Sequence, residues 1–243
     1  MTGKLNWYIR RSNFNCCTLG PQTGLTKLFE MDVMMETLLT DLETTVDPAH
    51  TAVLVVDIQN DFCATGGHTE TNLKKSVADC QSVVEPIQAL VAETRAAGAS
   101  VIWIKADYDR RYLSPPIHAR QLSRGISDAY CVAGTWGAEF YQVSPVDGDT
   151  IIEKHRHSAF IGTGLDQVLR DREIKTLIMA GVQTHVCVES TLRDASARGY
   201  YIVVAGDCVA SFDRDLHEKT LRCVEMHFGE VVNSAEIVKL WKG

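Results

Sequence analysis

The stretch from residue 176 to residue 198 decides the fold: it reads TLIMA (176–180), GVQTHVC (181–187) and VESTLRDASAR (188–198). The apolar run predicts a strand buried on both faces, and the amphipathic pattern after it predicts a helix. Cys187 stands at the junction, where backbone N–H groups and the positive end of the helix dipole favour a thiolate. A packing cysteine is the alternative, because free cysteine is among the most buried residue types.

Two further chemical groups follow two other predicted strands. Residues 51–56 form an uninterrupted apolar and β-branched run that ends at Asp57, and the short run 150–152 is followed by Glu153 and Lys154. In open parallel sheets, ligands bind outside the carboxyl ends of strands, so an acid, a base and a thiol are expected in one crevice. For Lys154 the alternative is a surface lysine whose ammonium stays in water.

The rest of the chain alternates between strand and helix patterns, which predicts one α/β domain. Strands are expected at 51–56, 99–106, 150–152, 176–180, 201–205 and 231–232. Helices are expected at 74–97 with a bend near Pro86, and at 164–172, 188–198, 213–227 and 234–240. Residues 107–148 are rich in Tyr, Pro, Gly and charge and predict a long connection with short helical pieces that covers the crevice.

Composition limits the function classes. The net charge of −7 and the pI near 5.6 argue against a nucleic-acid-binding protein, because phosphate binding needs a concentrated positive field. No run of 18 apolar residues predicts a membrane span. The eight cysteines show no disulfide framework and no C-x-x-C pair, which favours reduced thiols in a cytoplasmic protein. Cys63 follows the Asp57 segment and could approach the crevice, whereas Cys208 and Cys223 are expected in the core.

The first fifty residues differ in character from the rest. Residues 1–30 are basic and lack the continuous apolar centre of a secretory signal. They are interpreted as an N-terminal extension, either a targeting or partner-binding arm or an upstream translated segment, with Met31, Met34 and Met35 as alternative starts. The predicted division is an extension and lead-in at 1–50 and one domain at 51–243.

Three segments carry a resemblance to a known family. They are Val56-Asp57-Ile58-Gln59-Asn60-Asp61-Phe62, Lys154 with Ser158-Ala159-Phe160, and Gly181-Val182-Gln183-Thr184-His185-Val186-Cys187-Val188. In this order they resemble the signature segments of the isochorismatase-like cysteine hydrolases, over residues 51 to about 240. The resemblance implies an α/β three-layer sandwich with a central, mainly parallel six-stranded sheet and helices on both faces.

The resemblance also implies roles for individual residues. Cys187 would be the nucleophile, Asp57 the general base and acid, and Lys154 the group that lowers the thiol pKa and steadies the carboxylate. A cis peptide bond is implied between Val182 and Gln183, with the backbone N–H groups of Gln183 and Cys187 forming the oxyanion hole. The Thr184 hydroxyl is expected to brace this turn.

Within the family, the segments 186–194 and 154–160 look most like the ureide and carbamoyl amidohydrolases, which act on ureidoacrylate, N-carbamoylsarcosine, biuret or triuret. A homo-oligomer, a small-molecule substrate and no cofactor are expected. The nicotinamidase branch of the family carries a metal site, made of an Asp-x-His near the first strand and a pair of histidines after the second. No metal is expected here, because His68 lacks an acidic residue two positions earlier, segment 107–109 lacks histidine and His118 is isolated. Substrate contacts are expected from Gln59, Asn60, Phe62, Trp136, His157, Ser158, Phe160 and Gln183.

Two alternatives remain at the level of the sequence. One is a nicotinamidase-like or other small-amide hydrolase, which shares the three groups. The other is a non-enzymatic member of the superfamily, such as a redox sensor centred on Cys187 or a regulatory protein.

Overall fold

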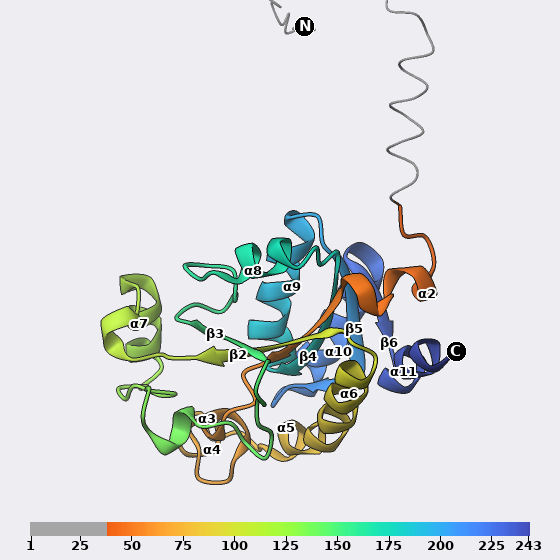
Figure 1. The fold of residues 1–243 in the computed structure, drawn as a ribbon. Helices are drawn as coiled ribbons and strands as arrows, with labels where there is room; N and C mark the ends of the chain where they lie inside the picture. Colours follow the sequence, from red (N-terminus) through yellow and green to blue (C-terminus); the bar gives the residue numbers. More distant parts are fainter. Residues whose placement is uncertain (1–37) are drawn as a thin grey trace, which may run out of the picture. The chain divides into compact units, whose positions relative to one another are not determined.

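The computed structural model describes residues 38–243, and Thr40–Gly243 form a compact unit (Figure 1). The expected extension at 1–30, with Cys16 and Cys17, and the alternative starts Met31, Met34 and Met35 lie outside the described residues. Two short helices, α2 (Leu42–Thr45) and η1 (Pro48–His50), precede the first strand. Between them Val46 is fully buried, and its carbonyl oxygen accepts a 2.7 Å hydrogen bond from the Trp241 indole N–H.

A six-stranded sheet forms the centre of this unit, with the order β3-β2-β1-β4-β5-β6. Every pairing between these strands is parallel. The strands are β1 (Thr51–Val56), β2 (Ser100–Ala106), β3 (Thr150–Lys154), β4 (Thr176–Val182), β5 (Tyr201–Ala210) and β6 (Gly229–Val232). The predicted α/β architecture with a parallel six-stranded sheet is therefore confirmed.

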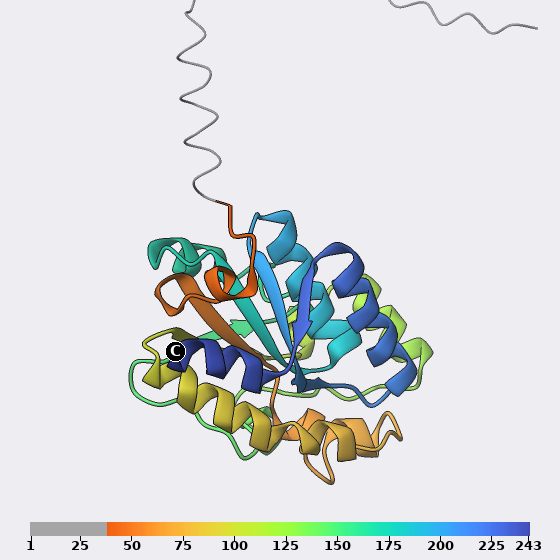
Figure 2. The same cartoon turned by 90° about the vertical axis from the view of Figure 1, so that its right-hand side faces the viewer.

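Helices cover both faces because successive strand residues point to opposite sides. On β1, Val53 and Val55 pack beneath α5 (Ala78–Ser82), α6 (Val84–Ala96) and α11 (Ser234–Lys242). Leu54 and Val56 point to the other face, under α8 (Leu165–Asp171), α9 (Glu189–Ala197) and α10 (Arg214–His227). Figure 2 shows α6 and α11 side by side over their face. The two apolar layers fix the register of the sheet.

Two predicted elements differ most from the structure. The helix expected at 74–97, with a bend near Pro86, begins at Ala78 and is broken at Val83 into two helices, α5 and α6. Pro86 explains the break, because its ring would clash with the carbonyl group of Ser82 and it offers no N–H, whereas the third position of a new helix tolerates it. Strand β5 continues to Ala210 beyond the polar pair Gly206-Asp207, and its last residues pair with Gly181 and Val182.

The segment 107–148 is irregular, as predicted, and contains η2 (Arg110–Tyr112), α7 (Pro115–Ser123) and η3 (Trp136–Ala138). Figure 1 shows α7 beyond the carboxyl end of β2. The remaining short helices, α3 (Asn60–Cys63) and α4 (His68–Thr71), follow β1 directly. Residues after β1 and β2 therefore lie at the same end of the sheet.

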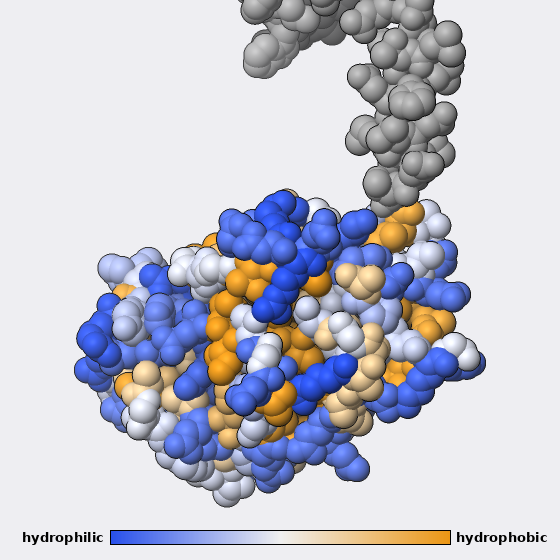
Figure 3. Space-filling view, in the orientation of Figure 1, coloured by the Kyte–Doolittle hydropathy of each residue, from blue (hydrophilic) through white to orange (hydrophobic). Residues whose placement is uncertain are grey.

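The surface is mostly polar. Among the described residues, no helix is long and apolar enough to cross a membrane. Strand β3 forms one edge of the sheet, and its Ile151 is 51% exposed. On the face seen in Figure 3, hydrophobic residues gather near the middle and are flanked by hydrophilic ones.

Candidate active site

Three buried side chains meet at the carboxyl ends of β1, β3 and β4. The Lys154 Nζ atom lies 2.8 Å from Asp57 Oδ2 and 3.4 Å from Cys187 Sγ. Lys154 and Asp57 have no exposed surface, and Cys187 is 5% exposed. The structure thus brings together the acid, the base and the thiol that follow three separate strands in the sequence.

The backbone at each strand end sets these positions. Lys154 is the last residue of β3, and the alternation along this strand turns Lys154 inward while Glu153 points to solvent. Asp57 follows β1 with a φ of 54°, a left-handed conformation that costs a non-glycine residue energy and is often found at functional sites. Its N–H donates to the carbonyl oxygen of Ile104 on β2.

The end of β4 approaches β1 so closely that only glycine fits at position 181. Gly181 has a φ of 111°, and a Cβ atom there would lie 2.1 Å from the Val56 carbonyl oxygen. A cis peptide bond follows between Val182 and Gln183, at the position that the resemblance implies. Among the described residues, none accepts a hydrogen bond from the Gln183 N–H. This donor is therefore available to a ligand.

The turn that carries Cys187 is a π-helical segment, η4 (Thr184–Val188), which runs into α9. The Thr184 hydroxyl lies 2.9 Å from His217 Nδ1 on α10, which braces the turn. The Thr191 hydroxyl donates to the Cys187 carbonyl oxygen at 2.7 Å and accepts from the Ala159 N–H at 3.1 Å. One hydroxyl group on α9 therefore joins the cysteine turn to the segment that follows Lys154.

The buried environment of Cys187 opposes the thiolate that the sequence predicts. The pKa of Cys187 is raised to about 12, chiefly by burial and also by the nearby Asp57 carboxylate, while Lys154 acts in the opposite direction. Burial opposes the charge on Lys154, yet Asp57 and Cys187 together hold its pKa above the ordinary value. In the free protein the site therefore holds a neutral thiol beside a buried Lys–Asp ion pair. Lys154 lowers the pKa of Cys187 as expected, but burial raises this pKa by more and so opposes the expected thiolate.

Tyr108 also belongs to this cluster, and the sequence analysis missed it. Its hydroxyl accepts a hydrogen bond from Lys154 Nζ at 3.0 Å, lies 3.7 Å from Cys187 Sγ and donates to the Arg156 carbonyl oxygen at 3.3 Å. Burial raises the pKa of Tyr108 well above its ordinary value, so the hydroxyl keeps its proton. Its place in the sequence carries a signal, because Tyr108 is the second residue after β2 and so lies near the carboxyl end of a parallel strand, as Asp57 does.

The cluster opens into a cavity of about 720 Å³. Cys187 and Tyr108 lie in its wall, together with residues from the segments that follow β1, β2 and β5. Of the expected substrate contacts, Phe62, His157 and Gln183 line this cavity. The Gln183 side-chain amide is already engaged, since its Oε1 accepts from the Phe212 N–H at 2.9 Å.

Five expected substrate contacts do not line the cavity. The Gln59 side chain bonds to the Ala106 N–H and to the Ala106 and Ala138 carbonyl oxygens, and Asn60 donates to the Trp136 carbonyl oxygen. Trp136 itself is 51% exposed. The Ser158 hydroxyl accepts from the Phe160 N–H, and the Phe160 ring packs against Tyr200. These polar groups hold the loops together because buried backbone groups need partners.

One group of potential metal ligands occurs in the described part of the chain. Asp107, Glu153 and His155 place side-chain ligand atoms within 4.8 Å of one another. The His155 Nδ1 atom lies 2.9 Å from the Asp107 carbonyl oxygen. None of the three lines the Cys187 cavity, so this group is separate from the thiol.

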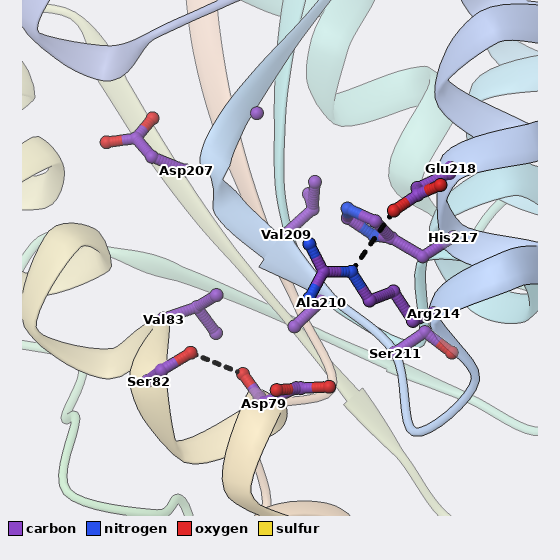
Figure 4. Close-up of a pocket in the computed structure, with 11 residues that line it drawn as sticks. Asp79, Ser82, Val83, Asp207, Val209, Ala210, Ser211, Arg214, His217 and Glu218 are labelled. Atoms are coloured by element: carbon purple, nitrogen blue, oxygen red, sulfur yellow. Dashed lines mark hydrogen bonds and ion pairs between the residues drawn. The ribbon is translucent and has the colours of Figure 1, made fainter.

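A second cavity, of about 300 Å³, lies between α5, β5 and α10 (Figure 4). Its charged lining consists of Asp79, Asp207, Arg214 and Glu218, and Arg214 forms a 3.1 Å ion pair with Glu218. His217 also lines it, and burial lowers the pKa of this ring. No member of the Asp57, Lys154 and Cys187 cluster lines it. Two of its lining residues contact the turn that carries Cys187: His217 bonds to Thr184 and Ser211 bonds to His185.

The other cysteines that the structure describes line neither cavity, although the Cys80 sulfur accepts a 3.4 Å hydrogen bond from the Gln183 side-chain amide. Cys63 is fully buried and lines neither cavity. Cys208 is buried as expected, but Cys223 is half-buried on α10, where the Arg193 guanidinium donates to its sulfur at 3.3 Å, so a core position for Cys223 is wrong. All six cysteines within residues 38–243 are unpaired.

Comparisons with known proteins agree with this geometry. Residues 51–236 match the isochorismatase domain family. The chain is 32% identical over 209 residues to the ureidoacrylate amidohydrolase RutB of Acinetobacter baylyi, covering 80% of this chain and 85% of that protein. A cysteine hydrolase from Pseudomonas syringae pv. phaseolicola superposes with a TM-score of 0.72 and 29% identity, covering 82% of this chain and 95% of that one. The N-carbamoylsarcosine amidase of Thermoplasma acidophilum gives a TM-score of 0.62 and 27% identity, with 76% and 96% covered.

Proposed function

This chain belongs to the isochorismatase family, and from that premise we propose that it is a cysteine amidohydrolase that cleaves a C–N bond of a ureido or carbamoyl compound through a thioester. It is a hydrolase of C–N bonds other than peptide bonds. The observation that carries the proposal is the contact of Lys154 with both Asp57 and Cys187 at the wall of a cavity.

In the first step, Cys187 Sγ attacks the substrate carbonyl carbon and Asp57 takes the thiol proton. The proton transfer has to accompany the attack, because the free thiol is neutral. The N–H groups of Gln183 and Cys187 stabilise the oxyanion of the tetrahedral intermediate. Lys154 forms the ion pair with Asp57, and its charge balances the negative charge that develops at the sulfur 3.4 Å away.

In the second step, Asp57 returns this proton to the leaving nitrogen as the C–N bond breaks, so ammonia or an amine departs and a thioester remains. A water molecule then attacks the thioester, and Asp57 accepts its proton. Collapse of the second tetrahedral intermediate breaks the C–S bond and restores the Cys187 thiol with that proton. Acid–base help of this kind is worth about 10²–10⁴-fold in rate.

A ureide is proposed as the substrate for two reasons. The relatives from Acinetobacter baylyi and Enterobacter sp. are ureidoacrylate amidohydrolases, the second at 34% identity over 206 residues. The carbon of a ureide is also a poor electrophile, because nitrogen lone pairs feed its carbonyl group. Its cleavage requires a strong nucleophile and prearranged oxyanion donors, which Cys187 and the turn at Gln183 supply.

Ammonia release from a substrate panel tests the proposal. We expect ureidoacrylate, N-carbamoylsarcosine, biuret or triuret to be cleaved with a higher kcat/KM than nicotinamide. Cys187→Ala should abolish turnover, and Asp57→Asn and Lys154→Ala should each lower it at least about 10²-fold. A preference for nicotinamide would overturn the ureide assignment, and full activity of Cys187→Ala would overturn the cysteine mechanism. Peroxide-driven disulfide formation without any ammonia release would instead favour a redox sensor.

A cytoplasmic location and a homo-oligomer are also proposed. The location rests on the cysteine spacing in the sequence, and the homo-oligomer rests on the family resemblance. Light scattering of the purified full chain checks the second, and a monomer would contradict it.

A further inference from the structure

The cavity beside Cys187 is larger than a simple ureide requires. Its volume of about 720 Å³ lies within the range of about 300–1,000 Å³ that encloses a drug-sized ligand. A ureide of a few non-hydrogen atoms would fill only the part next to the thiol. The remaining wall should therefore contact another portion of the substrate.

Much of this wall is apolar. Phe62 and Tyr130 contact each other edge to face, with ring centroids 6.0 Å apart, and Tyr130 stacks on His68 at 4.0 Å. Phe212 and Leu216 line another part of the cavity, at the start of α10. Aromatic and aliphatic side chains of this kind stabilise a ligand by removing apolar surface from water. A substrate that is polar throughout would leave these groups without such a partner.

The positive charge lies at the outer part of the cavity. Arg120 and Arg124, on α7 and directly after it, line the cavity with exposed side chains, whereas Cys187 is almost fully buried. Within residues 38–243, neither guanidinium group forms an ion pair. Arginine presents a planar fork of donors that matches a carboxylate.

The other lining groups do not cancel this charge. Burial lowers the pKa of His68, His157 and His185, so these rings are neutral at pH 7. Lys75 adds a further positive charge, and its Nζ atom lies 6.0 Å from the Phe212 ring centroid. Asp213 contributes one negative charge to the lining.

Resting on the proposed cleavage of ureides, we infer that the preferred substrate is a ureido acid with an apolar or aromatic body. Its ureido carbonyl lies next to Cys187, and its carboxylate, at the far end, binds Arg120 and Arg124. The body between them packs against Phe62, Tyr130, Phe212 and Leu216. This assignment names a larger and more apolar substrate than biuret, triuret or N-carbamoylsarcosine.

Three probes separate the contributions of the body and the carboxylate. They are 4-(ureidomethyl)benzoate, which has both, benzylurea, which lacks the carboxylate, and ureidoacetate, which lacks the aromatic body. We expect the benzoate to exceed each of the other two in kcat/KM by at least tenfold. Its KM should rise with added salt, because exposed charges are screened, while the KM of benzylurea stays constant.

Variants of the arginines test their role. The double variant Arg120→Ala with Arg124→Ala should raise the KM for the benzoate at least tenfold, without changing kcat or the KM for benzylurea. Arg120→Lys with Arg124→Lys should recover part of the loss. Arg110→Ala is the matched control, because Arg110 is an exposed arginine of the same segment that does not line the cavity, and it should behave like the wild type.

The outcomes distinguish this inference from the proposed function. Cleavage of ureidoacetate or biuret at least as fast as of the benzoate, or an unchanged KM in the arginine variant, overturns the inference and leaves the ureide hydrolase standing. Absence of ammonia from every ureide overturns the proposed function. Calorimetry with Cys187→Ala protein then still tests the cavity, since tighter binding of the benzoate than of benzylurea supports the inferred contacts and equal binding refutes them.

Discussion

At Cys187, desolvation decides the state of the thiol. A strand-to-helix junction and a neighbouring ammonium both favour a thiolate, but the side chain is 5% exposed and its pKa rises to about 12. The ionised Asp57 beside it adds to this rise. The neutral thiol is suited to a mechanism in which attack and proton transfer to Asp57 occur together. The site thus limits reaction of its own nucleophile until a carbonyl group is present.

Alkylation by iodoacetamide measures this state, because the thiolate is the reacting form. We expect the rate at Cys187, followed by mass spectrometry of its peptide, to keep rising at about pH 10, where an ordinary thiol with a pKa of about 8.5 has levelled off. Asp57→Asn removes the charge that raises the thiol pKa, so alkylation at pH 8 should become faster while turnover falls. A rate that levels off below pH 9 would contradict the neutral thiol.

The Tyr108 hydroxyl is predicted to hold Lys154 and the sulfur in their relative positions. Tyr108→Phe removes its 3.0 Å bond to Lys154 and its contact with Cys187 but keeps the ring. We expect kcat to fall about tenfold, a loss of roughly one charge-assisted hydrogen bond, with KM nearly unchanged. Tyr130→Phe is the control, because this aromatic residue lines the same cavity without touching the ammonium. An equal loss of kcat in both variants would refute the specific role.

At the scale of elements, the approach of β4 to β1 depends on one glycine. Gly181→Ala would place a Cβ atom 2.1 Å from the Val56 carbonyl oxygen, which neither strand can avoid. We expect a loss of roughly 3 kcal/mol or more in the free energy of unfolding. Gly199→Ala is the matched control, with a φ of 91° and no atom within 4 Å of the added Cβ, and should cost about 1–2 kcal/mol. Urea denaturation measures both, and equal losses would contradict the steric argument.

The elements were largely predictable from sequence because the strands are buried on both faces and form continuous apolar runs. Predictions were less accurate where one residue changes the geometry without changing the pattern. A bend is expected near Pro86, but the helix is divided there although its apolar face continues, and Gly206-Asp207 hides the second half of β5. In the site, a pattern cannot show whether a polar residue faces a ligand or a backbone group. Gln59 and Asn60 bind the backbone of neighbouring loops, and Tyr108 was overlooked.

At the scale of the whole molecule, the compact unit begins before β1. Val46 is fully buried and bonded to Trp241 near the other end of the chain. A protein that begins at Thr40 should keep the activity and stability of the full chain. One that begins at Thr51 loses this burial and one hydrogen bond, and should unfold with about 2 kcal/mol less free energy. Calorimetric melting compares the two shortened proteins. Equal stability would show that the folded domain begins at Thr51.

The catalysis is predicted to need no metal ion, because the histidine pattern of the metal-bearing branch of the family is missing from the sequence. Exhaustive dialysis against EDTA should leave kcat unchanged. His155→Ala, which removes a ligand from the group with Asp107 and Glu153, should also leave kcat unchanged. Loss of activity in both cases, with recovery of the dialysed protein on adding zinc, would contradict the prediction.

The position of Lys154 on an edge strand determines how the enzyme loses activity on heating. Strand β3 is bonded to β2 alone, so it lacks the second row of hydrogen bonds that holds β1, β2, β4 and β5. Edge strands open by local fluctuation at a lower free energy than central strands. When β3 separates from β2, we expect the Lys154 ammonium to move away with it. Cys187 and Asp57 should stay in place, because they follow the two middle strands, β4 and β1. Heating should therefore abolish catalytic activity at a temperature at which most backbone amides are still protected from hydrogen exchange.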